Sequence, residues 1–158
     1  MPISSNFVSM TQTKPLKDFN GWEMVSWGTF REGIKQILIR QNIDFDDRFE
    51  ILRFSFQEMQ TVLKFNELSQ MKAVHQSTDF HLVRLEESKA FYEKLKKDLI
   101  HKYDQPQYVH DDKDGEVTTL HWYLLHTHIK LVYDYKYKVI DELGAGAYRI
   151  DLYFDPQN

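Results

Sequence analysis

The sequence contains no cysteine, and this absence removes several kinds of chemistry. Disulfides, thiolate metal sites, iron–sulfur clusters and a cysteine nucleophile are all excluded. No apolar run approaches the roughly 20 residues that a membrane-spanning helix needs, so we expect no membrane span. The net charge is only -4, with acidic and basic residues interspersed. Because binding to phosphates requires clustered Lys and Arg, this pattern argues against a nucleic-acid partner.

The motifs of several enzyme classes are missing as well. The chain has no G-x-S-x-G elbow, no P-loop and no dinucleotide glycine fingerprint. Residues 144–147 (Gly-Ala-Gly-Ala) lead into a predicted strand, whereas a phosphate site needs a helix N-terminus. Carboxylates that are neighbours in sequence, such as Asp46 and Asp47, fall in predicted loops and are typical of a solvated surface. We therefore expect no enzyme and no cofactor.

Seven histidines and one acidic segment raise the question of metal binding. His121, His126 and His128 are the closest together, but strand alternation places His121 and His126 on opposite faces. The acidic segment 111–116 does not match the order of ligands in an EF-hand loop. We expect no metal site, and a melting temperature that a chelator leaves unchanged.

The first 20 residues read as a flexible polar lead-in. Residues 1–14 lack the apolar core of a signal peptide, so the chain as given is expected to be soluble and untargeted. The same composition is also typical of the leader of a mature secreted protein. An extracytoplasmic location therefore stays open, for the case in which a signal peptide was removed.

Helical periodicity predicts two helices, over about residues 30–41 and about 85–102. Thr29 and Glu32 form a capping-box pattern before the first, and Pro106 follows the second. Alternating apolar residues and intervening turn residues predict six strands. Their approximate ranges are 49–56, 59–65, 68–75, 117–125, 128–135 and 147–154.

The order of these elements predicts an α+β fold, with helices packed on antiparallel sheet. We expect a single domain over residues 21–158, made of two helix–three-strand units in tandem, about 21–78 and about 79–158. The two units share a pattern but no residue-by-residue identity. Seven residues should be buried in mutual contact: Leu95, Leu99, Trp122, Ile129, Leu131, Ile150 and Leu152. Trp22 and Trp27 should anchor the core with Trp122.

Four parts of the sequence carry a family resemblance: residues 27–35, residues 91–106, Trp122 and residues 129–133. Together they resemble a diffuse group of bacterial proteins that have the fold of β-lactamase inhibitor proteins. The best match is the helix pattern YEKLK-x-x-L-x-x-KYG-x-P, in which Asp104 stands where glycine is usual. The resemblance spans about residues 20–155. It implies a mostly uncharacterised, extracytoplasmic group whose known members bind other proteins with the open face of the sheet, and it implies no catalytic residues.

One face of the last three strands combines Tyr, Arg and His with aliphatic residues, as protein-binding surfaces do. The predicted partner-binding residues are His121, Tyr123, Lys130, Arg149, Asp151 and Tyr153. We expect a non-enzymatic inhibitory or adaptor protein that binds an unknown protein partner.

Two alternatives stay open. The first is a small-ligand carrier or an enzyme, with a pocket between helices and sheet lined by Tyr133, Tyr135 and Tyr148. The second is a structural domain that forms oligomers.

Overall fold

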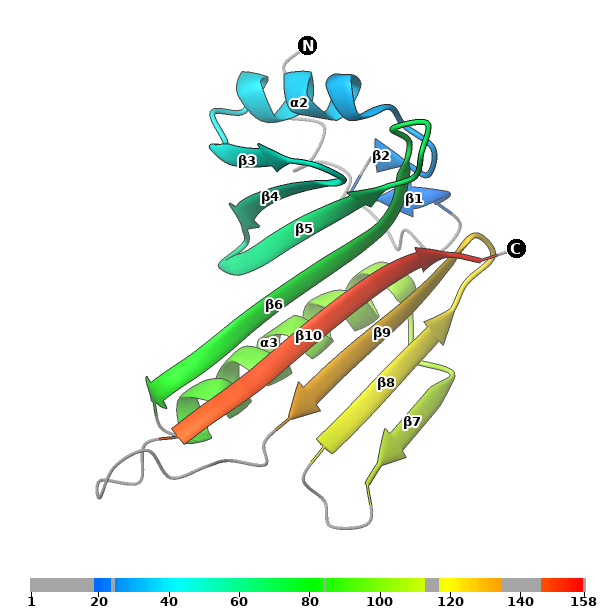
Figure 1. Ribbon diagram of the computed structural model, residues 1–158. Helices are drawn as coiled ribbons and strands as arrows, with labels where there is room; N and C mark the ends of the chain where they lie inside the picture. Colours follow the sequence, from blue (N-terminus) through cyan, green and yellow to red (C-terminus); the bar gives the residue numbers. More distant parts are fainter. Residues whose placement is uncertain (1–18, 24, 84, 113–116, 135–145, 158) are drawn as a thin grey trace.

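The computed structural model describes residues 19–23, 25–83, 85–112, 117–134 and 146–157. Within these residues the chain forms ten strands and two helices (Figure 1). The helices are α2 (Arg31–Arg40) and α3 (Leu85–Tyr103). The strands are β1 (Gly21–Trp22), β2 (Val25–Ser26), β3 (Phe45–Arg48), β4 (Ile51–Phe56), β5 (Met59–Phe65), β6 (Met71–Val83), β7 (Tyr108–Asp111), β8 (Val117–Tyr123), β9 (Thr127–Asp134) and β10 (Gly146–Pro156).

Eight of the strands form one antiparallel sheet in the order β3-β4-β5-β6-β10-β9-β8-β7, while β1 and β2 pair as a short separate ribbon. The predicted tandem of helix–three-strand units is therefore wrong. Each helix is followed by four strands, and both sets of four belong to the same continuous sheet, joined where β6 pairs with β10. Antiparallel pairing itself is confirmed throughout this sheet.

Of the eight strands in this sheet, the two that the sequence did not reveal are the edge strands, β3 and β7; the short strands β1 and β2 were not predicted either. Neither alternates apolar and polar residues: β3 reads Phe-Asp-Asp-Arg, and all four residues of β7 are exposed. Asp is uncommon in strands because it gains little from a pleated, half-buried surface. Charged edge strands also discourage pairing with other chains, so such a sequence is usual at the edge of a sheet.

Charge, rather than apolar burial, ties β3 to α2. Asp47 accepts hydrogen bonds from Arg31 and from Lys35, whose Nζ lies 2.8 Å from Asp47 Oδ2. These bonds, with Lys35 the larger influence, lower the pKa of Asp47 below its ordinary value. The predicted capping box is not formed, because the Thr29 hydroxyl donates to the Ser26 carbonyl instead. The helix start carries no side-chain cap.

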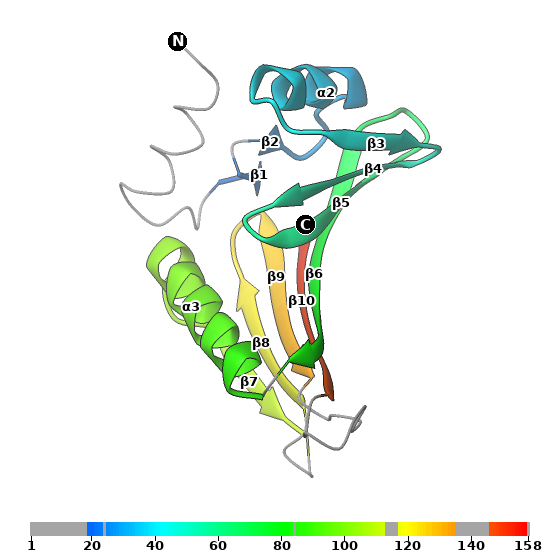
Figure 2. The ribbon, with the colours of Figure 1, turned by 90° about the vertical axis from the view of Figure 1, so that its left-hand side faces the viewer.

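Both helices lie on the same side of the sheet, which we call the inner face (Figure 2). Helix α2 and the β1–β2 ribbon cover the β3–β5 end, while α3 runs along β6, β10, β9 and β8. No helix among the described residues covers the opposite side, which we call the outer face. Within the described residues, the sheet therefore has one side packed under helices and one side without a helix.

The inner-face side chains form a single apolar core under both helices. Six of the seven residues that the sequence pattern places in the core are buried, and Leu95 on α3 is only partly buried. Trp122 is fully buried, with its indole donating to the Asp104 carbonyl at 2.8 Å, and Trp22 is 3% exposed. The buried six are Leu99, Trp122, Ile129, Leu131, Ile150 and Leu152.

Truncating Leu131 tests this core. Leu131 is 0% exposed, so we expect Leu131→Ala to lower the free energy of unfolding by about 2–5 kcal/mol, because it leaves a cavity. Leu95→Ala should cost less, since Leu95 already borders open space, and Leu125→Ala, at 67% exposed, should cost about 0.5 kcal/mol or less. Urea unfolding measures all three. Equal losses at Leu131 and Leu125 would contradict the inner-face assignment.

Candidate functional site

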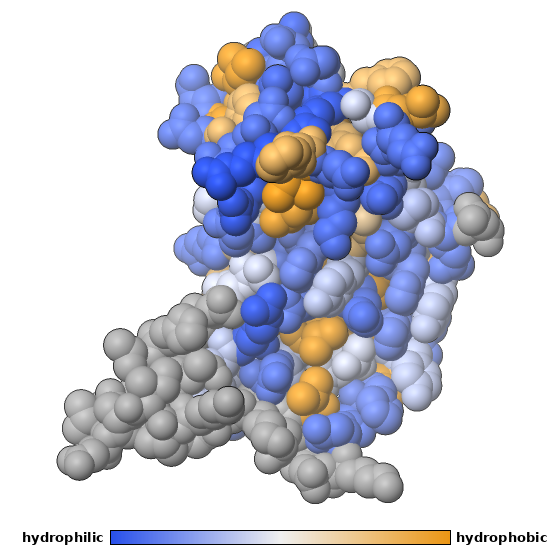
Figure 3. Space-filling view, in the orientation of Figure 1, coloured by the Kyte–Doolittle hydropathy of each residue, from blue (hydrophilic) through white to orange (hydrophobic). Residues whose placement is uncertain are grey.

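A straight row of aromatic and cationic residues crosses the outer face. Its five members are direct register neighbours on β7, β8, β9, β10 and β6: Tyr108, His121, Lys130, Tyr153 and His75. We call these five residues the aromatic row. Adjacent strands lie about 4.8 Å apart, so the row is about 19 Å long. Figure 3 looks onto this face and shows a mainly hydrophilic surface with scattered apolar side chains, not a continuous aliphatic patch.

Ring contacts join three of the four neighbouring pairs in the aromatic row. Tyr153 stacks on His75, with ring centroids 4.4 Å apart and planes 7° apart. The Lys130 ammonium lies 4.6 Å from the centre of the Tyr153 ring, a cation–π contact. At the other end, the rings of Tyr108 and His121 are tilted, with centroids 5.6 Å apart. Such cross-strand pairs also stabilise the sheet that presents them.

His121 and His128 form a hydrogen-bonded imidazole pair beside the row. His121 Nδ1 and His128 Nε2 lie 2.9 Å apart, whereas the ring centroids are 5.2 Å apart and the planes differ by 2°. The nitrogens therefore lie between the ring centres, and the rings meet edge to edge. Tyr123 stacks across them, 4.6 Å from His128 and 5.5 Å from His121. This N–H···N bond needs one donor and one acceptor, so two fully protonated rings cannot form it.

The surroundings favour the neutral form of this pair. Partial burial lowers the pKa of His121, and the nearby His128, Lys130 and His110 lower it further. Burial also lowers the pKa of His128, with Lys130 acting in the same direction and Asp155 opposing both. Near neutral pH the pair is therefore an uncharged aromatic surface.

Asp151 organises the far end of the aromatic row. Its two carboxylate oxygens bind His75 Nε2 and Arg149 Nε, each at 2.8 Å. The Asp151 side chain is 10% exposed, while that of Arg149 is 51% exposed. Burial, and next the Asp151 charge, raise the pKa of Tyr153, which keeps its hydroxyl protonated. Asp151 thus positions its neighbours and presents little surface of its own.

All six residues predicted for partner binding lie on the outer face, at different depths. Tyr123 is 49% exposed and Arg149 is also exposed, whereas Asp151 is buried. The remaining three are half-buried: His121, Lys130 and Tyr153.

Sequence reasoning missed His75, Tyr108 and His128, which complete the surface. His128 shares the strand phase of Lys130, so alternation along β9 could have revealed it. Tyr108 lies on β7, which carries no strand signal. His75 joins the set only through the pairing of β6 with β10, which links strands about 70 residues apart.

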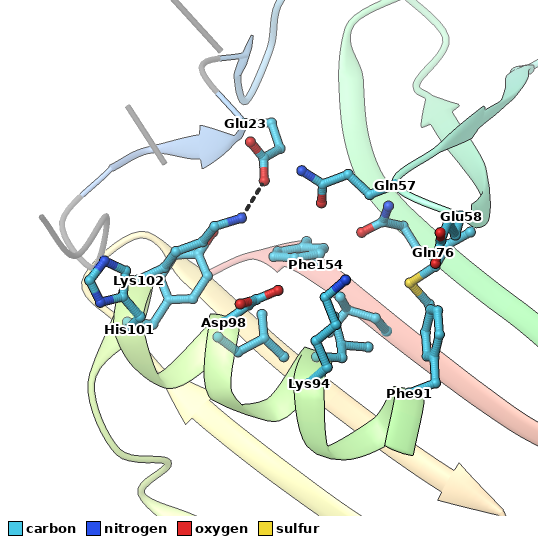
Figure 4. A pocket seen from close by; sticks show the side chains of 15 residues that line it. Glu23, Gln57, Glu58, Gln76, Phe91, Lys94, Asp98, His101, Lys102 and Phe154 are labelled. Atoms are coloured by element: carbon cyan, nitrogen blue, oxygen red, sulfur yellow. Dashed lines mark hydrogen bonds and ion pairs between the residues drawn. The ribbon is translucent and has the colours of Figure 1, made fainter. Parts of the chain in front are cut away.

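On the inner side, a cleft of about 430 Å³ opens between α3, the β4–β5 turn, the β1–β2 ribbon and the sheet (Figure 4). Its apolar lining includes Met59, Leu152 and Phe154. At one end Lys102 forms an ion pair with Glu23, with Nζ 3.0 Å from Oε1 and both side chains largely buried. The size and the mixture of apolar floor and polar rim are those of a small-molecule site.

Three polar residues around this cleft have an unusual backbone. Glu23, Gln57 and Glu58 have φ values of 43°, 53° and 67°, in the left-handed region that favours glycine. Gln57 and Glu58 form the two-residue turn between β4 and β5, where both positions require positive φ and Asn-Gly is the usual choice. Left-handed backbone at such residues costs about 1 kcal/mol or more, and it recurs at ligand sites.

The alternative pocket predicted from tyrosines is not the one observed. Tyr133 and Tyr148 are 3% and 2% exposed, and the Tyr133 hydroxyl is hydrogen-bonded to Ser88 at 2.5 Å. Both belong to the core, and neither lines the cleft. Tyr135, most of the acidic segment and the predicted glycine loop around 144–145 lie outside the described residues.

Within the described ranges, no group of three or more His, Asp or Glu side chains is arranged to hold a metal ion. Neither of the helices that the structure describes is long and apolar enough to cross a bilayer. A comparison with protein-family models, curated protein sequences and solved structures finds no match to this chain.

The histidine pair should make stability fall in acid. A histidine whose pKa is lowered by folding binds protons better when unfolded, so stability is lost as pH falls through the ordinary value of 6.5. The loss continues until pH is below the lowered pKa values. We expect His128→Gln to lose less stability between about pH 7.5 and about pH 5 than the wild type does. Urea unfolding at both pH values measures this loss, and His126→Gln serves as the control. If His128→Gln loses as much stability between the two pH values as the wild type does, the prediction is wrong.

The strained β4–β5 turn gives a second prediction. Glycine adopts positive φ without cost, so Glu58→Gly should raise the free energy of unfolding by about 0.5–1 kcal/mol, after allowing for glycine's greater freedom in the unfolded chain. Gln60→Gly, in the adjacent strand, should lower it by a similar amount. Thermal unfolding of both variants decides the matter. A lower melting temperature for Glu58→Gly would show that no strain resides in this turn.

Proposed function

We propose that the protein binds another protein through the outer face, using the aromatic row with Tyr123 and Arg149 beside it. The observation that carries this proposal is that an ordered set of exposed and half-buried aromatic, imidazole and cationic side chains lies on a sheet face that no described helix covers. The role is that of an adaptor or inhibitor and involves no chemical reaction.

The kinds of residue support a protein partner. Tyr and Arg are over-represented among interface residues that contribute most to binding, because they offer large contact area at low entropic cost. Here ring stacking restrains Tyr123 and Tyr153 before any partner arrives. Such pre-organisation reduces the entropy lost on binding.

The charges on this face favour a protein over a nucleic acid. Lys130 and Arg149 are interspersed with Asp134, Asp151 and Asp155 on the same side of the same strands. A surface that bound phosphates would need cations without carboxylates among them. A mixed pattern of charges instead suits a complementary protein surface.

The resemblance to proteins with the β-lactamase-inhibitor-protein fold points to the same class of partner. Members of that group with a known role bind proteins with the open face of the sheet. In this chain the sheet face without a described helix carries the aromatic row.

Site-directed crosslinking tests the proposal. A photoreactive phenylalanine analogue replacing Tyr123 should crosslink to a partner protein in extracts of the native cells, because this side chain is half exposed beside the aromatic row. The same analogue replacing Phe49, which is 97% exposed at the β3–β4 turn, is the matched control.

The crosslinked protein is then purified and its affinity measured. Tyr123→Ala and Arg149→Ala should each weaken binding by about tenfold or more, while Lys97→Ala on the far side of α3 should leave it unchanged. Wild-type unfolding midpoints for the variants would exclude an effect on folding. Equal affinity for all three variants would refute the proposed surface.

A further inference from the structure

Two solvent-exposed charged side chains at the cleft on the inner side form no ion pair with another described residue. Lys94 and Asp98 extend from successive turns of α3 into the cleft (Figure 4). Neither forms an ion pair with any other residue in the described part of the chain, although Lys102 and Glu23 at the end of the same cleft do. Asp98 does not pair with Lys102, four residues further along the helix, because Lys102 binds Glu23 instead. An ammonium and a carboxylate are thus left facing the cleft.

Two side-chain amides lie across the cleft from these charges. Gln76, on β6, is only 4% exposed, and its Nε2 donates to Thr61 Oγ1 at 3.1 Å. Gln57 projects over the cleft from the strained β4–β5 turn (Figure 4). Burying an amide among apolar side chains is unfavourable unless its hydrogen bonds are made. A side-chain amide carries both N–H donors and an acceptor oxygen, so it can complement the single donor and single acceptor of a peptide bond.

We infer that the cleft binds a short apolar peptide with free termini, of about two residues. Lys94 receives the carboxylate and Asp98 the ammonium group. The amides of Gln57 and Gln76 bind the peptide bond, and the apolar side chains rest on Leu152 and Phe154.

The spacing of Lys94 and Asp98 and the volume of the cleft are compatible with a dipeptide. Residues four apart on a helix have Cβ atoms about 6 Å apart. Two residues of extended chain span about 7 Å, whereas the ammonium and carboxylate of one amino acid are separated by a single carbon atom. The volume of about 430 Å³ lies within the usual range for small-ligand sites.

The backbone provides support that is independent of the charges. Three of the non-glycine residues with positive φ, Glu23, Gln57 and Glu58, line this cleft. Glycine would adopt this backbone without strain, but it would place no side chain at the cleft. Strain retained at a cavity rim is typical of a ligand site.

This inference is separate from the proposed function, since the cleft and the aromatic row lie on opposite faces of the sheet. Either can fail without the other.

Calorimetric titration of the full chain with L-leucyl-L-phenylalanine tests it. We expect saturable binding to the wild type, weakened about tenfold or more by Lys94→Gln and by Asp98→Asn, because each removes a charged hydrogen bond. Lys97→Gln, on the same helix but outside the cleft, should bind like the wild type.

Capped peptides sharpen the test. Replacing the carboxylate of the dipeptide by an amide should weaken binding to the wild type by about as much as Lys94→Gln weakens binding of the free dipeptide. Once the carboxylate is an amide, Lys94→Gln should cause no further loss of affinity. The N-acetyl dipeptide should behave in the same way with Asp98→Asn. Absence of binding at millimolar dipeptide, or equal binding of free and capped forms, would overturn the inference.

Discussion

The pairing of β6 with β10 is the constraint on which both candidate sites depend. These two long strands join the halves of the sheet, with Tyr153 opposite His75 and Leu152 opposite Gln76. Because successive residues of a strand face opposite sides, His75 contributes to the aromatic row and its neighbour Gln76 to the cleft. A slip of one residue would exchange the faces, burying the row and exposing the apolar core. Deep burial of Ile150, Leu152 and Phe154 on the inner side opposes such a slip.

The side chains on the two faces of the sheet are held in place by different contacts. The inner face is covered by α2 and α3, and its side chains are packed except where α3 diverges from the β4–β5 turn. No helix of the described chain covers the outer face, and stacking and charge contacts between its own side chains order it. The cleft on the inner face is concave and apolar, which suits a small ligand. The outer face is a large open surface, which suits a protein partner.

Much of the fold could be predicted from periodicity, because strong amphipathic patterns reflect burial directly. Helix α3 and strand β5 agree with their predicted ranges to within about one residue, which is the uncertainty of such boundaries. The edge strands could not be found, since their residues are exposed and no burial pattern arises. The single eight-stranded sheet was missed because pairing between β6 and β10 links residues distant in sequence, and no local signal encodes it.

The candidate site, too, could be predicted from the sequence only in part. The outward phase of Tyr123, Arg149 and Tyr153 follows from alternation and was predicted. Local sequence patterns do not reveal the stacking of Tyr153 on His75 or the hydrogen bond between His75 and Asp151, because both depend on strand order. The cleft is formed by a turn, a ribbon and a helix that meet only in three dimensions.

Hydroxyl-radical footprinting of the protein alone and bound to its crosslinked partner tests the central claim, that the outer face is the binding surface. Side chains that a partner covers react more slowly. The account predicts that Tyr108, Tyr123 and Tyr153 are protected in the complex, while the exposed Phe49 and the cleft residue Phe91 react as before. Protection of Phe49 or Phe91, with the three tyrosines unchanged, would contradict it.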